Sequence, residues 1–406
     1  MLPVKKQTTH TQDKILSIIE SSLETGKDLD VLLNKNGFSY NDLRYKTNPS
    51  PQLVESSYQS LEEFNKPFNG IPVESFFSGC GGLDLGFESA GFEHLVLIEH
   101  NELFCDTLRH NRDWEIIGPP YSSGDVSNRY EIANNLKKHG VKKGFNGVFI
   151  GGPPCQPFSI ASNQRFSKKG ENFKRTGFNH EKNGNLLFDF VWQIKHFKPK
   201  AFLIENVPGL IELDEGEQVK NIYDELTSAG YTINAPFKVN AAHYSVPQNR
   251  ERVFIIGYLG SKELVEPAKG QEVVSCLSAI SSIDEACPNH VTRKHKANSV
   301  SRYIELEVGK RDKLGRVDRL NPSLPSKTVI AGGTSGGGRS HLHPYIPRTL
   351  SVRECARLQT FPDDYEFTGS SARQFTQVGN AVPPVLAAQL ATAIYDSYFS
   401  NQKQKT

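Results

Sequence analysis

Residues 73–87, with the sequence VESFFSGCGGLDLGF, decide the fold. The apolar run VESFF (73–77) predicts a short buried strand, and the residues after the glycines predict a helix. Gly79, Gly81 and Gly82 lie between the two, where the missing Cβ atoms let the backbone approach a ligand closely. A strand, a glycine turn and a helix in this order are typical of the ligand-binding edge of a parallel sheet.

A second expected strand, HLVLIE (94–99), ends at Glu99, about 17 residues beyond this glycine cluster. A carboxylate in that place can accept hydrogen bonds from both hydroxyls of a ribose. The combination predicts a nucleoside-cofactor site, for either a dinucleotide or S-adenosylmethionine. Asp125, in the turn SSGDV, is a candidate partner for an adenine amino group, and an ordinary turn aspartate is an equal alternative.

The alternation of strands and helices continues to about residue 260. Further strands are expected at GVFIGG (147–152), AFLIEN (201–206) and RVFIIGYL (252–259), with a helix over LLFDFVWQIKHF (186–197). This pattern predicts an α/β fold with a doubly wound, mostly parallel sheet. Ligands bind such sheets at the carboxyl ends of the strands, which is where the unusual residues of this chain fall.

The flanking regions differ in character. Residues 1–70 predict a helical appendage and linker, because Ile15, Ile18, Ile19 and Leu23 share one helical face. A helix-turn-helix is possible there, although packing against the main body is the better expectation. Residues 71–260 form the expected sheet domain, residues 261–348 a smaller second domain, and residues 349–406 a segment that returns to the first.

Composition excludes several classes of protein. The 406 residues contain no run of 18 apolar residues, which argues against a transmembrane helix, and the N-terminus has no apolar core of a secretory signal. The six cysteines form no CxxC pair, which argues against a zinc site and a disulfide scaffold and favours a reducing cytoplasm. Residues 292–350 hold twelve basic and four acidic residues, an excess that suits nucleic acid or simply a solvated loop region.

Cys155 lies in the rigid frame GGPPCQPFS (151–159), directly after an expected strand. A thiolate held there could attack electrophilic carbon, and a buried inert cysteine is an equal alternative. Glu205 ends another strand, where partial desolvation would raise its pKa and make it a general acid. Arg250 and Arg252 alternate on one strand face and suit an anion or a carbonyl group, or a pair of surface ion pairs.

Together these motifs resemble the DNA (cytosine-5)-methyltransferase family. The matching blocks are F-x-G-x-G-G (77–82), Glu99, Gly-Asp (124–125), G-P-P-C-Q (152–156), E-N-V (205–207), Q-N-R-E-R (248–252), R-E-C-A-R-L-Q-x-F-P (353–362) and Q-V-G-N-A-V-P-P (377–384). Their order matches the family throughout and covers roughly three quarters of the chain, without residues 1–70. The resemblance implies the S-adenosylmethionine-dependent methyltransferase fold, with residues 261–348 as a DNA target-recognition domain.

The resemblance also implies roles for individual residues. Cys155 would add to C6 of cytosine, Glu205 would protonate N3, and Arg250 and Arg252 would hold the base carbonyl and brace the cysteine loop. The implied S-adenosylmethionine site contains Phe77 against the adenine, Glu99 at the ribose, Asp125 at the adenine amino group and Asn380 at the methionine end, together with Gly79, Gly81, Gly82 and Pro153. His100 stands where many relatives carry a bulky side chain against the adenine. No metal is expected.

The implied substrate is a cytosine flipped out of double-stranded DNA, with the long segment after Cys155 closing over it. Candidate DNA contacts are Ser159, Arg165, Arg339 and Arg353. The helix-like run 385–399 would fold back beside the first strand and close the cofactor site. We expect a monomer in the bacterial cytoplasm, with a cognate restriction endonuclease as a functional partner.

Two other functions are alternatives to DNA methylation. A transfer-RNA cytosine-5 methyltransferase shares the motifs, but the Cys-Phe-Thr signature of that class is missing from the recognition region. A DNA-binding regulator could instead use the N-terminal helices as its DNA reader. The joint presence of Cys155, Glu205 and Arg250 favours an active enzyme.

Overall fold

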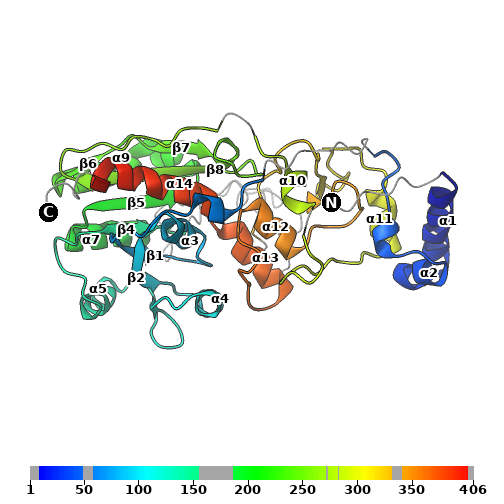
Figure 1. Cartoon of the computed structure of the whole chain (residues 1–406), viewed down its shortest axis with the longest axis horizontal. Coiled ribbons are helices and arrows are strands. Elements are labelled where there is room, and N and C mark those ends of the chain that lie inside the picture. Colours follow the sequence, from blue (N-terminus) through cyan, green and yellow to red (C-terminus); the bar gives the residue numbers. More distant parts are fainter. Residues whose placement is uncertain are drawn as a thin grey trace. The chain divides into compact units, whose positions relative to one another are not determined.

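The computed structural model describes residues 9–48, 58–154, 186–270, 273–281, 283–331 and 341–400. Its contacts divide the chain into two compact units. The sheet unit consists of Ser60–Tyr244, Arg250–Gln271 and Ala381–Thr406, and the loop-rich unit consists of Met1–Gln59, Ser245–Asn249 and Glu272–Asn380. Figure 1 labels most of the helices and the longer strands of both units.

The sheet unit is built on a mixed eight-stranded sheet with the strand order β3-β2-β1-β4-β5-β8-β6, and β7 pairs with β8. β1 to β5 run parallel to one another, and β8 runs antiparallel to β5, β6 and β7. The strands are β1 (Pro72–Phe76), β2 (Glu93–Ile98), β3 (Ile116–Ile117), β4 (Val148–Gly151), β5 (Ala201–Asn206), β6 (Tyr231–Ile233), β7 (Phe237–Asn240) and β8 (Glu251–Leu259).

Helices cover both faces of this sheet, as expected for a doubly wound fold. On one face, Phe76, Phe149 and Phe202 join Phe190 and Ile222 in the main hydrophobic core; on the other, Leu97 packs with Cys105 and Leu108. The helices are α3 (Gly82–Ser89), α4 (Glu102–Asn111), α5 (Arg129–Lys138), α7 (Leu186–Phe197), α8 (Gly209–Glu212), α9 (Glu217–Ser228) and α14 (Pro384–Ile394). Single turns are η2 (Leu61–Phe64), η5 (Leu213–Gly216), η6 (Ala241–His243) and η7 (Tyr395–Phe399).

The C-terminal helix α14 packs directly on α3, the helix that follows the glycine turn. A Cβ atom on Gly86 would lie 2.3 Å from the Cβ atom of Ala387, so the two backbones touch where only glycine fits. The sequence predicts that the helix-like run 385–399, which contains most of α14, lies beside the first strand. The structure places it on the helix that this strand leads into.

The described part of the loop-rich unit has little regular structure. Its elements are α1 (Thr9–Thr25), α2 (Leu29–Lys35), η1 (Tyr40–Asp42), α10 (Cys276–Ile280), α11 (Ala297–Tyr303), β9 (Asp318–Arg319), β10 (His341–Leu342), α12 (Val352–Leu358) and α13 (Ser371–Asn380). β9 and β10 pair in parallel. The N-terminal helices pack on α11 through a core that includes Ile15, Ile19, Leu33 and Val300.

The two units differ from the domain boundaries that the sequence suggests. The N-terminal helices group with residues 272–380 because their apolar faces are buried against α11. Residues 349–380 group with the same unit, where Arg353 is bonded to backbone near residue 288, and only the chain from Ala381 onward belongs to the sheet unit. Within the described residues, no helix is long and apolar enough to cross a membrane.

Candidate active site

The turn between β1 and α3 is held by Glu99. The Gly79 N–H donates to Oε2 of Glu99 at 2.7 Å, and the Asn101 N–H donates to Oε1 at 2.7 Å. Burial raises the pKa of Glu99, and these backbone donors oppose that shift. Glu99, which is predicted to bind the ribose, therefore links the end of β2 to the turn that follows β1.

The backbone of this turn is in an unusual conformation. Gly79 and Gly81 have φ values of +57° and +82°, which favour glycine. Phe77 also has a positive φ, +56°, a conformation that costs a residue with a side chain about 1–2 kcal/mol. The ring of Phe77 meets Phe190 edge to face at 6.2 Å. Such strain is concentrated at functional sites, and here it affects a residue predicted to contact the adenine.

Two further glycines bring the loop with Asp125 against Glu99. Cβ atoms on Gly118 and Gly124 would lie 2.3 and 2.1 Å from the Glu99 carbonyl oxygen, so neither position accepts a side chain. His100 Nδ1 lies 2.8 Å from the Ser123 carbonyl oxygen and ties the two loops together. Gly79, Glu99, His100 and Asp125 are thus neighbours at one edge of the sheet.

Asp125 has the geometry of a turn aspartate. Its Oδ1 accepts from the N–H of Ser127 at 3.0 Å and from the Ser127 hydroxyl at 2.7 Å. This hydrogen bonding orients the carboxylate. Its contact with an adenine amino group stays a prediction.

The Gly-Gly pair before Cys155 is required by close packing. A Cβ atom on Gly152 would lie 2.9 Å from Oε2 of Glu205, and one on Gly151 would lie 2.9 Å from the Phe190 ring. Pro153, the next residue, is buried. The backbone that leads to Cys155 therefore runs against the Glu205 carboxylate.

Glu205 and Arg252 form an ion pair across the neighbouring strands β5 and β8. Nε of Arg252 lies 2.7 Å from Oε1 of Glu205, and the two side chains are 13% and 12% exposed. Arg250 is fully buried beside them. Burial lowers the pKa of Arg250 well below its usual value, the Arg252 charge lowers it further, and Glu205 acts in the opposite direction. Both arginines thus act on the same carboxylate.

The motif that supplies these arginines is divided between the two units. Gln248 belongs to the loop-rich unit, where its amide donates to the Leu358 carbonyl at 3.2 Å and to Oε1 of Gln359 at 2.8 Å. Arg250 and Arg252 belong to the sheet unit. Asn380 is the exposed last residue of α13 in the loop-rich unit, and its contact with the cofactor stays a prediction.

Arg353 is not available as a DNA contact, which corrects the prediction for this residue. Its side chain is 0% exposed. Its guanidinium donates to the backbone carbonyls of Pro288 at 2.9 Å, Pro362 at 2.6 Å and Tyr365 at 2.6 Å. A group that satisfies three buried carbonyls holds the unit together.

The other predicted residues, Cys155, Ser159, Arg165 and Arg339, lie outside the described residues, as does most of the segment expected to close over the base. Sequence reasoning missed the roles of Gly118 and of the ring of Phe190. Only the spacing of glycines around Glu99 could have pointed to Gly118.

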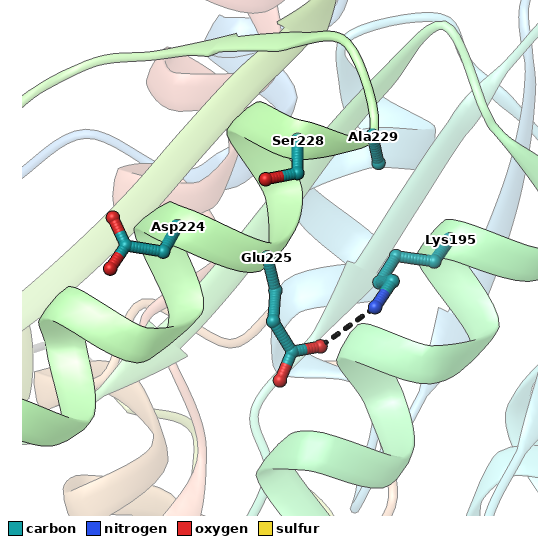
Figure 2. Close-up of a pocket in the computed structure, with 5 residues that line it drawn as sticks. All are labelled: Lys195, Asp224, Glu225, Ser228 and Ala229. Carbon is teal, nitrogen blue, oxygen red and sulfur yellow. Dashed lines mark hydrogen bonds and ion pairs between the residues drawn. The ribbon is translucent and has the colours of Figure 1, made fainter.

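A shallow hollow elsewhere on the sheet unit has no part in this site. Figure 2 shows the residues that line it, with Lys195 on α7 pointing toward Glu225 on α9, with Asp224 and Ser228 also on α9, and with Ala229 directly after this helix. The Lys195–Glu225 ion pair spans it at 3.0 Å. Both helices reach the hollow near their C-terminal ends, which lead into β5 and β6, so it lies toward the amino ends of the strands.

The family comparison decides what these residues belong to. Residues 71–396 match the model of the C-5 cytosine-specific DNA methylase family. The chain belongs to this family. It is therefore a DNA cytosine-5 methyltransferase, as the sequence motifs predict.

Curated relatives of this methyltransferase are similar over most of their length. The Type II methyltransferase M.NgoFVII of Neisseria gonorrhoeae is 31% identical over 372 residues, which cover 85% of this chain and 92% of the relative. The Type II methyltransferase M.PspPI of Psychrobacter sp. (strain TA137) is 33% identical over 391 residues, covering 85% and 88%.

Solved structures share the fold of the methyltransferase. A protein encoded within an E. coli prophage has a TM-score of 0.65 at 24% identity, with 81% of this chain and 99% of that one covered. The Entamoeba histolytica methyltransferase EhMeth has a TM-score of 0.57 at 16% identity, with 81% and 98% covered. The predicted α/β fold of the methyltransferase type is confirmed.

Proposed function

We propose that the methyltransferase transfers a methyl group from S-adenosylmethionine to C5 of a cytosine flipped out of a specific duplex DNA sequence. The observation that carries this proposal is the grouping of side chains at the ends of adjacent strands. Glu99, at the end of β2, holds the glycine turn that follows β1. Glu205, at the end of β5, lies against Gly152 after β4 and pairs with Arg252 at the start of β8. Ligands of doubly wound sheets bind at such strand ends.

The first group of residues fits a nucleoside cofactor. Gly118 and Gly124 keep Cβ atoms away from the Glu99 backbone, Gly79 provides a positive φ in the turn, and Phe77 offers an aromatic ring in the same strained turn. Glu99 would accept hydrogen bonds from the ribose hydroxyls in place of the Gly79 and Asn101 N–H groups, with Asp125, His100, Pro153 and Asn380 around the cofactor. S-adenosylmethionine, when bound, supplies a methyl group carried on a sulfonium sulfur.

The second group fits activation of the cytosine ring. The Cys155 thiolate would form a bond to C6, which moves electron density to C5 so that C5 can accept the methyl group. Glu205 would protonate N3 and stabilise the charge that develops on the ring, while Arg252 and Arg250 hold Glu205 and the base carbonyl. Loss of the C5 proton would then expel the Cys155 thiolate and restore the aromatic ring.

Cys155→Ala tests this mechanism directly. We expect the variant to lose methyl transfer while it still binds duplex DNA, because only the covalent step is removed. Cys287→Ala is the matched control, since Cys287 is a partly exposed thiol of the loop-rich unit and should be dispensable. Methyl transfer by the Cys155→Ala variant would disprove the assigned nucleophile.

We further propose that the methyltransferase modifies host DNA at one recognition sequence as part of a restriction-modification system, as the names of its relatives suggest. It would act as a monomer in the bacterial cytoplasm, and the restriction endonuclease would be a functional partner. Methylome sequencing of a host that expresses the chain should give one modified sequence context. Methylation of transfer RNA in place of duplex DNA would contradict this proposal.

A further inference from the structure

The N-terminal helices lie outside the family match, yet they form part of the core of the loop-rich unit. Buried residues from α1, α2 and the following turn pack against α11. This core consists of Ile15, Ile18, Ile19, Leu29, Leu33, Tyr40 and Leu43 on the N-terminal side and Ala297, Val300 and Ile304 on the other. The N-terminal helices therefore share a hydrophobic core with α11, which belongs to the basic segment 292–350.

The chain after these helices is held by Arg319, the last residue of β9. We call the contact of Arg319 with Tyr45 and with the backbone around them the clasp. The Arg319 guanidinium donates to the carbonyls of Thr47 at 2.8 Å and Leu306 at 2.7 Å, and to the side chain of Asn48 at 3.1 Å. It also donates twice to the Pro344 carbonyl, at 3.0 and 2.8 Å. One buried arginine thus joins three separate segments of the unit.

Tyr45 completes the clasp from the N-terminal side. Its ring lies under the Arg319 guanidinium, with 3.6 Å between the guanidinium carbon and the ring centroid. Its hydroxyl donates to the His343 carbonyl at 2.8 Å, directly after β10. The backbone N–H of Lys46 donates to the Ile304 carbonyl at 2.9 Å. Tyr45 and Arg319 therefore fix the ends of both β9 and β10.

The clasp uses charge in the interior of the unit. Burial lowers the pKa of Arg319 only to about 10, so the guanidinium is charged at neutral pH. Two other basic residues, Lys327 and Arg311, are paired with Asp318 of β9 at 2.6 and 3.3 Å. The basic segment therefore holds its own strands in place with part of its charge.

We propose that residues 9–48 are part of the DNA-recognition element, and that Tyr45 and Arg319 are positioning residues that set β9 and β10 for DNA binding. This inference rests on the proposed function, because it assumes that the basic segment in the loop-rich unit meets DNA. The inference makes one prediction that a detached N-terminal appendage would not make. Damage to the clasp should weaken the use of DNA and spare the binding of cofactor by the sheet unit.

Single substitutions in the full chain test the inference. Tyr45→Ala and Arg319→Met should each raise KM for the recognised duplex at least tenfold. They should leave kcat and the calorimetric Kd for S-adenosylmethionine within twofold of the unmodified chain. Tyr45→Phe keeps the ring beneath Arg319 and loses only the hydroxyl's bonds to the His343 and Ile346 carbonyls, so its KM should rise less than threefold.

Asp30→Asn is the control within the same interface, since it weakens an exposed ion pair with Lys294, removes no basic charge and leaves the clasp intact. Its KM should not change. An unchanged KM in both clasp variants would overturn the inference, even if their melting temperatures fall. A parallel loss of cofactor binding and DNA use would overturn it too, since the clasp would then support the whole chain.

Failure of the proposed function would look different. If the unmodified chain methylates no DNA, the proposed function itself fails. If the unmodified chain methylates DNA and the clasp variants do so with the same KM, only the role of residues 9–48 is wrong.

Discussion

Arginines of the sheet unit and of the loop-rich unit are used in different ways. In the sheet unit, Arg252 reaches a carboxylate, Glu205, at the ends of two strands, where both side chains keep some exposure to solvent. In the loop-rich unit, Arg319 and Arg353 are fully buried and donate mainly to backbone carbonyls. The first arrangement leaves a charged group ready for a ligand, whereas the second replaces missing secondary structure.

The difference follows from how each unit satisfies its backbone. Strands of a sheet bond to one another, so its side chains are free for chemistry at the strand ends. In its described residues, the loop-rich unit has two short strands and a set of helices joined by long loops, and its buried carbonyls need other donors. A guanidinium with five N–H groups can serve several of them at once.

The largest expected effect concerns the strand-end carboxylate. Glu205→Gln keeps the size of the side chain and removes its ability to donate a proton, so kcat should fall by about 10²–10⁴-fold. Cofactor and DNA binding should change little. Single-turnover kinetics would measure this, and a variant with normal kcat would show that Glu205 is structural, like the buried arginines.

Arg353→Met tests the opposite half of the comparison. It removes the guanidinium N–H groups that three backbone carbonyls accept from, and we expect a loss of about 3–5 kcal/mol in the stability of the loop-rich unit. Chemical unfolding would measure the loss, with Arg373→Met on the surface of α13 as the control. Normal unfolding of Arg353→Met would contradict the structural role of this arginine.

Gly152→Ala sharpens the contrast at the catalytic edge. The added Cβ would lie 2.9 Å from Oε2 of Glu205, so the carboxylate or the backbone before Cys155 must move. We expect kcat to fall about tenfold or more, because small displacements of reacting groups cost rate, with little change in melting temperature. Gly140→Ala, where nothing lies within 4 Å of the new Cβ, controls for backbone effects, although its positive φ adds some strain.

The pH dependence of stability should have opposite signs in the two units. In the loop-rich unit, bidentate contacts with Arg348 lower the pKa of Glu354 to about 2. The stability from this pair is present above the unfolded value of 4.5 and is lost as the pH falls toward 2. Arg348→Met should therefore cost stability at neutral pH and cost much less at pH 2.

In the sheet unit, burial raises the pKa of Glu74 on β1 well above 4.5. Its contribution to stability is present below pH 4.5 and is lost as the pH rises toward the raised value. Glu74→Gln should therefore stabilise the chain at pH 8, by about 1–2 kcal/mol, and have little effect at pH 4. Thermal unfolding at the two pH values would measure this, and equal shifts at both would contradict it.

Local sequence was sufficient for the strands that build the site. The apolar runs of β1, β2, β4, β5 and β8 are long enough to stand out, and each lies within a residue or so of its predicted range. β3, β6 and β7 were not predicted, since β3 and β6 have only two and three residues and β7 (FKVN) has only two apolar ones. The helix pattern at 13–24 was recognised, and its packing partner α11, nearly 300 residues away, was not.

The sequence by itself determined the family, the sheet and the residue types at the strand ends, because these depend on local pattern and on motif order. Tertiary structure alone decided that Gly152 is glycine because Glu205 lies against it, and that Arg353 and Arg319 are interior. A buried and an exposed arginine look the same in a sequence. Only long-range packing determines whether a guanidinium is bonded to the protein's own backbone or is exposed to bind DNA.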